Sequence, residues 1–138
     1  MTRSPIADWL ADVGRLDFEA ALAAFAPHAR LLSPDGRRAQ GTAAIRERMR
    51  EFAAELRAVS YEVTAEWHQK DTWIVEAEAT YELRDYAEIG PVPCAMVARV
   101  GSAGIADLRI YGVHDQLIAE HHTGEEGMWV GRRWVPPL

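Results

Sequence analysis

Over the first third of the chain, apolar positions recur with the period of a helix. Ser4 and Asp17 are typical helix-capping residues, and each is followed by apolar side chains at i, i+3, i+4 and i+7. Gly14 ends the first repeat, and Pro27 prevents the second from continuing. A third repeat follows Thr42, another capping residue. The spacing predicts three amphipathic helices. Their apolar faces comprise Ile6, Trp9, Leu10 and Val13, then Phe18, Ala21, Leu22 and Phe25, then Ile45, Met49, Phe52 and Leu56.

After residue 58 the period changes from 3.6 to 2. Odd positions are apolar and even positions polar over residues 59–67, and the same alternation runs through 72–83, with its glutamates on the polar face. The runs at 92–100 and 105–113 are more apolar, and the Gly-containing loop Ser102–Gly104 between them suits a hairpin. Residues 128–138 add a short ribbon turned at Gly131. Helices followed by antiparallel strands predict an α+β fold, with the three helices packed on a curved, mostly antiparallel sheet.

Composition narrows the class of protein. The 138 residues are 49% hydrophobic, which suits one globular domain spanning 1–138. A net charge of -6 argues against nucleic-acid or anionic-membrane partners, which need a basic footprint. Cys94 is the single cysteine, so an internal disulfide is excluded and a cytoplasmic location is expected. We also expect no metal site, because His121 and His122 are adjacent and have no spaced third ligand, and no cofactor.

Two segments of the chain resemble a known superfamily. The stretch DFEAALAAFAPHARLLSPDGRRAQGTAAIRERM and the later LRIY are similar to the nuclear transport factor 2-like superfamily, the cone-shaped fold of ketosteroid isomerases and SnoaL-like polyketide cyclases. The resemblance covers most of residues 17–113. It implies a conical cavity between the helices and the concave face of the sheet.

The catalytic positions of the isomerases differ in this chain. The resemblance places their base at Ser33, with Asp35 displaced to the far side of Pro34, and their oxyanion acid at Met96. Their tyrosine falls near Ala7 or Trp9. Proton transfer needs a positioned base and an oxyanion donor, so ketosteroid isomerisation is disfavoured.

The cyclase pattern is also incomplete. Cyclases and related epoxide hydrolases often carry an acidic residue on the last strand, in a sequence motif similar to Arg-x-Tyr-x-Asp. Arg109 and Tyr111 match it, but Val113 stands at the acid's position and Asp115 comes two residues later.

The side chains expected on the inner faces are mostly apolar, which is the usual lining of a small-molecule pocket. The candidate ligand-binding residues are Trp9, Phe25, Met49, Phe52, Trp67, Trp73, Tyr81, Cys94, Met96, Leu108 and Ile110. The same residue types also form ordinary cores, and both interpretations stay open here.

The candidate catalytic group is His114, with Asp115 or Asp35 as the carboxylate that orients it. Position 114 continues the inward face of Leu108 and Ile110 by alternation. A histidine beside a carboxylate can act as a general base near neutral pH, whereas a histidine at a strand end can equally lie on the surface. Asp35 can likewise be a turn residue only.

Two function classes follow from these residues. The first is a SnoaL-like protein whose apolar cone holds a hydrophobic small molecule, without the isomerase residues. The alternative is a small isomerase, cyclase or hydrolase-type enzyme that uses His114 with Asp115 or Asp35. We also expect a homodimer, because residues of the Ile74 and Val97 type would otherwise be exposed on the outer face of the sheet.

Overall fold

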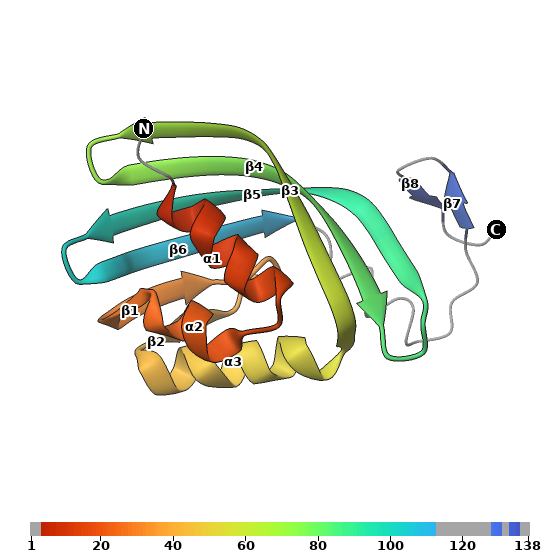
Figure 1. Cartoon of the computed structure of the whole chain (residues 1–138), viewed down its shortest axis with the longest axis horizontal. Helices are drawn as coiled ribbons and strands as arrows, with labels where there is room; N and C mark the ends of the chain where they lie inside the picture. Colours follow the sequence, from red (N-terminus) through yellow and green to blue (C-terminus); the bar gives the residue numbers. More distant parts are fainter. Residues whose placement is uncertain (1–3, 113–127, 131–132, 136–138) are drawn as a thin grey trace.

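The computed structural model describes residues 4–112, 128–130 and 133–135. Within them the order is three helices and eight strands in an α+β arrangement (Figure 1). The helices are α1 (Pro5–Gly14), α2 (Phe18–Ala23) and α3 (Thr42–Ala54). The strands are β1 (Phe25–Leu32), β2 (Arg38–Gln40), β3 (Leu56–Gln69), β4 (Thr72–Leu83), β5 (Glu88–Gly101), β6 (Gly104–Gly112), β7 (Met128–Val130) and β8 (Arg133–Val135).

Six strands form one curved, open sheet in the order β2-β1-β6-β5-β4-β3. Neighbouring strands are antiparallel except β1 and β6, which run parallel. Figure 1 shows the three helices gathered on one side of the bent sheet, with α1 lying across its strands. The predicted fold class is confirmed. The predicted C-terminal ribbon is present as the antiparallel pair β7 and β8, and Gly131 lies outside the described residues.

The predicted caps hold for the first two helices. The Ser4 hydroxyl accepts hydrogen bonds from the backbone N–H groups of Ile6 and Ala7, and the Asp17 carboxylate accepts one from Ala20. The prediction for the third helix is wrong by one residue. Its N-cap is Gly41, which has no side chain to accept a bond, and Thr42 is the first helical residue.

Phe25 and Leu56 belong to strands and not to the ends of helices as the spacing predicted. α2 ends at Ala23, and Phe25 opens β1 opposite Ile105 of β6. The two segments approach so closely that the Ile105 N–H donates to the Ala24 carbonyl at 2.9 Å. Leu56 likewise opens β3 and pairs with Leu83. Both side chains are buried, so the start of a strand buries them as well as a further helical turn would have done.

Strand parity is confirmed on β4 and β5. Val75, Ala77, Ala79, Tyr81 and Leu83 are buried on β4, as are Cys94, Met96 and Ala98 on β5.

On β3 the predicted parity fails beyond the first half of the strand. A register shift between Val63 and Ala65 turns the remaining residues over, and Trp67 is 51% exposed. A bulge of this kind reverses which face each later side chain occupies.

The hairpin between β5 and β6 is tighter than predicted. Gly101 pairs with Gly104, which leaves the two residues Ser102 and Ala103 as the loop. No helix in the described part of the chain has the length and apolar character needed to cross a membrane.

Candidate functional site

A cavity of about 340 Å³ lies between the helices and the concave face of the sheet. α1 contributes Trp9, Leu10 and Val13 to its wall, because the i, i+3, i+4 spacing puts one face of that helix on the sheet. The opposite wall consists of Cys94 and Met96 from β5, Ile110 from β6 and Leu31 from β1. These walls are apolar.

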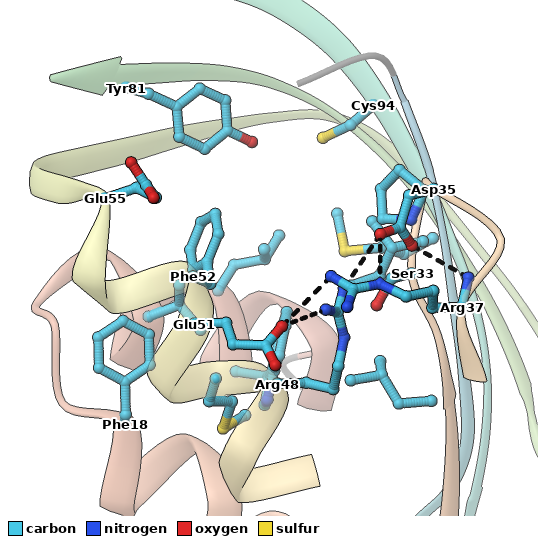
Figure 2. Close-up of a pocket in the computed structure, with 18 of the residues that line it drawn as sticks. Phe18, Ser33, Asp35, Arg37, Arg48, Glu51, Phe52, Glu55, Tyr81 and Cys94 are labelled. Atoms are coloured by element: carbon cyan, nitrogen blue, oxygen red, sulfur yellow. Dashed lines mark hydrogen bonds and ion pairs between the residues drawn. The ribbon is translucent and has the colours of Figure 1, made fainter. Parts of the chain in front are cut away.

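Four aromatic rings form a second wall. Phe18 packs edge to face against Phe52 with ring centroids 6.4 Å apart, Phe52 against Tyr81 at 6.0 Å, and Tyr81 against Tyr61 at 6.3 Å. The interplanar angles lie between 83° and 90°, the arrangement that ring quadrupoles favour. Figure 2 shows Glu55 on the same side of the cavity as Phe52 and Tyr81. The four rings hold one another in place through these contacts. They therefore fix the shape of this side of the pocket.

Charged side chains gather at one rim of the cavity, where the turn after β1 meets α3 (Figure 2). Arg48 Nη1 donates to Glu51 Oε2 at 2.6 Å, and Arg48 Nη2 lies 3.6 Å from Asp35 Oδ2. Arg37 Nε donates to Asp35 Oδ2 at 2.7 Å, and Arg37 Nη2 donates to Glu51 Oε2 at 3.2 Å. Each arginine thus contacts both carboxylates. We call these four residues the ion-pair rim.

A tight turn places Asp35 at the rim. The Gly36 N–H donates to the Ser33 carbonyl, and the Ser33 N–H donates to the Arg37 carbonyl, both at 2.9 Å. Gly36 has a φ of +85°, which glycine adopts without steric cost. Asp35 also accepts a hydrogen bond from the Arg37 backbone N–H at 3.0 Å. The apolar run of β1 ends here because the chain reverses through this turn.

The rim keeps Asp35 ionised. Partial burial acts to raise the pKa of Asp35, but the backbone and side-chain hydrogen bonds from Arg37 and the charge of Arg48 outweigh it. The pKa of the carboxyl is therefore lower than usual. A carboxylate held in this way is a weak general base.

Burial raises the pKa of the Cys94 thiol to about 11. The thiol is therefore protonated at neutral pH, and it lines the cavity as a small apolar group.

Two buried nitrogen atoms near the cavity have no hydrogen-bond partner among the described residues. They are Nε1 of Trp9 and Nε of Arg48. Both residues line the cavity. Leaving a buried donor unpaired costs free energy, so these two N–H groups lower the stability of this part of the cavity wall.

Seven of the eleven candidate ligand-binding residues line the cavity, namely Trp9, Met49, Phe52, Tyr81, Cys94, Met96 and Ile110. Phe25 and Leu108 are buried in the core and do not line it. Trp67 and Trp73 do not line it either. The bulge on β3 leaves Trp67 exposed, and Trp73 stacks on His68 with ring centroids 3.9 Å apart.

Of the candidate catalytic residues, Asp35 lies at the rim of the cavity. His114 and Asp115 lie outside the described residues. Arg109 and Tyr111, which match the cyclase motif, do not line the cavity, and Tyr111 is 46% exposed. Met96, at the isomerase acid position, is a wall residue. Within the described residues, no group of three or more His, Cys, Asp or Glu side chains could hold a metal ion.

The ion-pair rim was not predicted from the sequence pattern. Arg48 was not singled out, although it stands three residues after Ile45 and four before Phe52, next to the apolar stripe of α3. That spacing places its side chain beside the cavity wall, where it is only 16% exposed. An arginine flanking an apolar stripe was the signal that could have identified it.

Comparison with known proteins gives a family and a fold. A family model described as SnoaL-like domain matches residues 6–121. No curated protein matches the chain.

Several solved structures share the fold. A protein with a ketosteroid isomerase-like fold from Catenulispora acidiphila, in complex with trimethylamine, is 18% identical with a TM-score of 0.72, covering 80% of this chain and 86% of that one. An NTF2-like protein from Burkholderia pseudomallei is 14% identical with a TM-score of 0.73, covering 83% and 92%. TerC, co-crystallized with polyporic acid, is 14% identical with a TM-score of 0.71, covering 83% and 95%.

Proposed function

The chain belongs to the SnoaL-like domain family, and because its cavity is mostly apolar we propose that it binds a hydrophobic small molecule. The observation that carries the proposal is the division of the cavity. Apolar side chains and rings surround most of the space, whereas the ion-pair rim occupies one edge. Apolar walls favour binding by removing ligand surface from water, and a few polar groups orient the ligand.

The dimensions of the cavity suggest the class of ligand. Its volume of about 340 Å³ lies near the lower end of the roughly 300–1,000 Å³ typical of small-molecule pockets. A compact ring system fits this space against the walls of Trp9 and Phe52. The guanidinium groups of Arg37 and Arg48 offer N–H donors at the rim, so a ligand with a carbonyl or hydroxyl oxygen at one end suits the arrangement.

Two structural neighbours give independent support. One was solved with trimethylamine and another with polyporic acid. Those ligands belong to those proteins, and the identities of 18% and 14% carry the fold only. They support the view that a cone of this shape accommodates small molecules.

A proton-transfer enzyme is the second candidate function. Ile110 lines the cavity and Gly112 stands in register with Cys94, another wall residue, so alternation would carry the same face on to His114. This favours His114, with Asp115 as its orienting carboxylate. Asp35 is a poorer choice for the base, because its arginine partners lower its pKa.

The test of binding fills the cavity and compares the result with a matched surface change. Ile110→Trp adds an indole to a half-buried wall position, and Ala106→Trp adds one at an exposed position on the same strand. Titration calorimetry with hydrophobic ketones and fused-ring aromatic compounds should give measurable binding to the parent and to Ala106→Trp. Ile110→Trp should bind at least about ten-fold more weakly, which corresponds to about 1.4 kcal/mol. Equal binding to both variants would refute the site, and so would the absence of any bound compound.

A further inference from the structure

A carboxylate stands beside the aromatic side of the cavity. Phe18, Phe52 and Tyr61 line the cavity and are only partly buried, whereas Tyr81 is buried completely. Glu55 lines the cavity on the same side as these rings (Figure 2). The face of an aromatic ring carries negative electrostatic potential, and a carboxylate adds a full negative charge to it. This side of the cavity therefore favours a positively charged group.

Helix α3 separates this carboxylate from the ion-pair rim. Arg48, Phe52 and Glu55 are spaced i, i+4 and i+7, so they lie on one face of the helix. Glu55 is the C-cap residue and keeps helical geometry, with φ of -89° and ψ of -14°. At a rise of 1.5 Å per residue, the backbone of Glu55 lies about 10 Å further along α3 than that of Arg48. One ligand can therefore have one group at the ion-pair rim and another beside Glu55.

The charges around the cavity do not balance without a ligand. Among the described residues that line it, three side chains are acidic and two are basic. The four charges of the ion-pair rim balance one another, because each arginine contacts both carboxylates. Glu55 is the third acidic residue. Arg84 Nε donates to the Ala54 carbonyl at 2.6 Å at the end of α3, but Arg84 does not line the cavity. A ligand with one positive charge would balance the lining.

We propose that the ligand of this cavity is a compact ring compound with an ammonium group at one end and a hydroxyl or carbonyl oxygen at the other. The inference rests on the proposed function, because it names the class of ligand for the same site. The ammonium group lies against the aromatic rings and Glu55, and the oxygen accepts hydrogen bonds from Arg37 and Arg48. A quaternary ammonium suits the first position, because its charge is spread over apolar methyl groups that pack against rings.

Two probes of the same shape test the charge directly. They are 3-hydroxyphenyltrimethylammonium and 3-tert-butylphenol, which differ in whether nitrogen or carbon carries the three methyl groups. Both fill the same space, and only the first is a cation. In titration calorimetry at pH 7, the full chain should bind the ammonium probe at least about ten-fold more tightly than the phenol. Equal affinities, or tighter binding of the phenol, would overturn the inference.

Substitutions then separate charge from shape. Glu55→Gln keeps the size of the side chain and removes its charge, so it should weaken binding of the ammonium probe at least about five-fold and leave the phenol unchanged. Phe52→Leu removes a ring and keeps an apolar side chain, so it should weaken the ammonium probe at least about three-fold more than the phenol. Glu47→Gln is the matched control. It removes the same charge from a 64% exposed side chain of α3 outside the cavity, and both affinities should stay as in the parent.

The outcomes also distinguish this inference from the proposed function. If hydrophobic ketones bind to the parent and the ammonium probe does not, the cavity takes neutral ligands and only the inference is wrong. If no compound of either kind binds, both are wrong. Equal weakening of the two probes by Glu55→Gln would also count against the inference, because the side chain would then act through its shape. Circular dichroism melts check folding, and Phe18→Leu replaces Phe52→Leu if that variant unfolds.

Discussion

The carboxylate of Asp35 lies 3.6 Å from the guanidinium of Arg48, so an ion pair connects the turn after β1 to helix α3 at the rim of the cavity. Arg37 strengthens the same junction from within the turn, through its Nε at 2.7 Å from Asp35. An aspartate placed in this way positions the edge of a pocket. Its proximity to the cavity alone would have suggested a catalytic base, and its two arginine partners argue against that role.

Asp35→Asn tests the two roles. Asparagine suits the same turn and can accept the hydrogen bond from the Arg37 backbone N–H, while the ion pairs are lost. Because exposed ion pairs are worth roughly 0–1 kcal/mol, unfolding free energy should fall by less than about 1 kcal/mol in urea melts. Ligand affinity should stay within about three-fold of the parent. If a reaction is found and Asp35→Asn abolishes it in a folded protein, Asp35 is a base after all.

The pH dependence of that difference follows from the lowered pKa. A carboxyl whose pKa is lower in the folded state than in the unfolded chain stabilises the fold at pH values above its unfolded pKa. The stabilisation is lost as the pH falls from the usual value of 3.8 through the lower folded value. Urea melts of the parent and Asp35→Asn should therefore differ at pH 7 and converge once the pH has fallen below the lowered pKa of Asp35. A difference that grew as the pH fell would contradict the lowered pKa.

The fold could be predicted from the sequence because its periodic signals are strong. The 3.6 period of α1 and the alternation of β4 each bury one face, and no neighbouring element overrides them. The prediction failed where a local pattern had two solutions. Phe25 is equally buried at the end of a helix or at the start of a strand, and pairing with Ile105 on β6 decides between them.

The candidate site was only partly accessible to sequence analysis. Wall residues such as Trp9 and Met96 follow from parity and helical spacing. The ion-pair rim depends on the turn at Asp35 meeting α3 in space, and residues 35 and 48 have no periodic relation that would reveal it. Trp67 was misplaced because a one-residue bulge leaves no clear mark in an alternating pattern.

Cys94 should react slowly with thiol reagents. Burial raises its pKa from 9.0 to about 11, which lowers the thiolate fraction near neutral pH by about a hundred-fold. Alkylation by iodoacetamide at pH 7.5 should therefore be at least about ten-fold slower in the folded protein than in urea, because the greater nucleophilicity of a more basic thiolate offsets part of the lost thiolate fraction. A cavity ligand should slow it further, because Cys94 lines the wall. Modification at the unfolded rate would show that the thiol is open to solvent.

His114 should matter more to the cavity than any glutamate of β4. The expectation rests on alternation beyond Ile110, whereas Glu82 lies on the polar face of β4 and pairs with Arg57. His114→Ala should weaken binding of the ligands found by calorimetry by at least about five-fold, roughly 1 kcal/mol, and Glu82→Gln should leave it unchanged.

The histidine also separates the two candidate functions. If the protein is a proton-transfer enzyme, His114→Ala should lower turnover by about 10²–10⁴-fold, far more than it lowers affinity. Binding and turnover equal to the parent would remove His114 from the site and leave only the binding role.

Gly104 should be one of the least replaceable glycines. Its φ is +115°, and a Cβ there would lie 2.5 Å from the Ala24 carbonyl oxygen, at the point where the start of β6 approaches the end of α2. Gly104→Ala therefore has to strain the backbone and push the two segments apart. The expected loss is about 1–3 kcal/mol of unfolding free energy in urea melts.

Gly101 is the matched control, because it pairs with Gly104 in the same hairpin and a Cβ there meets no atom within 4 Å. Gly101→Ala should change stability by less than about 0.5 kcal/mol. Equal losses in the two variants would contradict both the strain from the positive φ and the close contact with Ala24 as the reason for glycine at position 104.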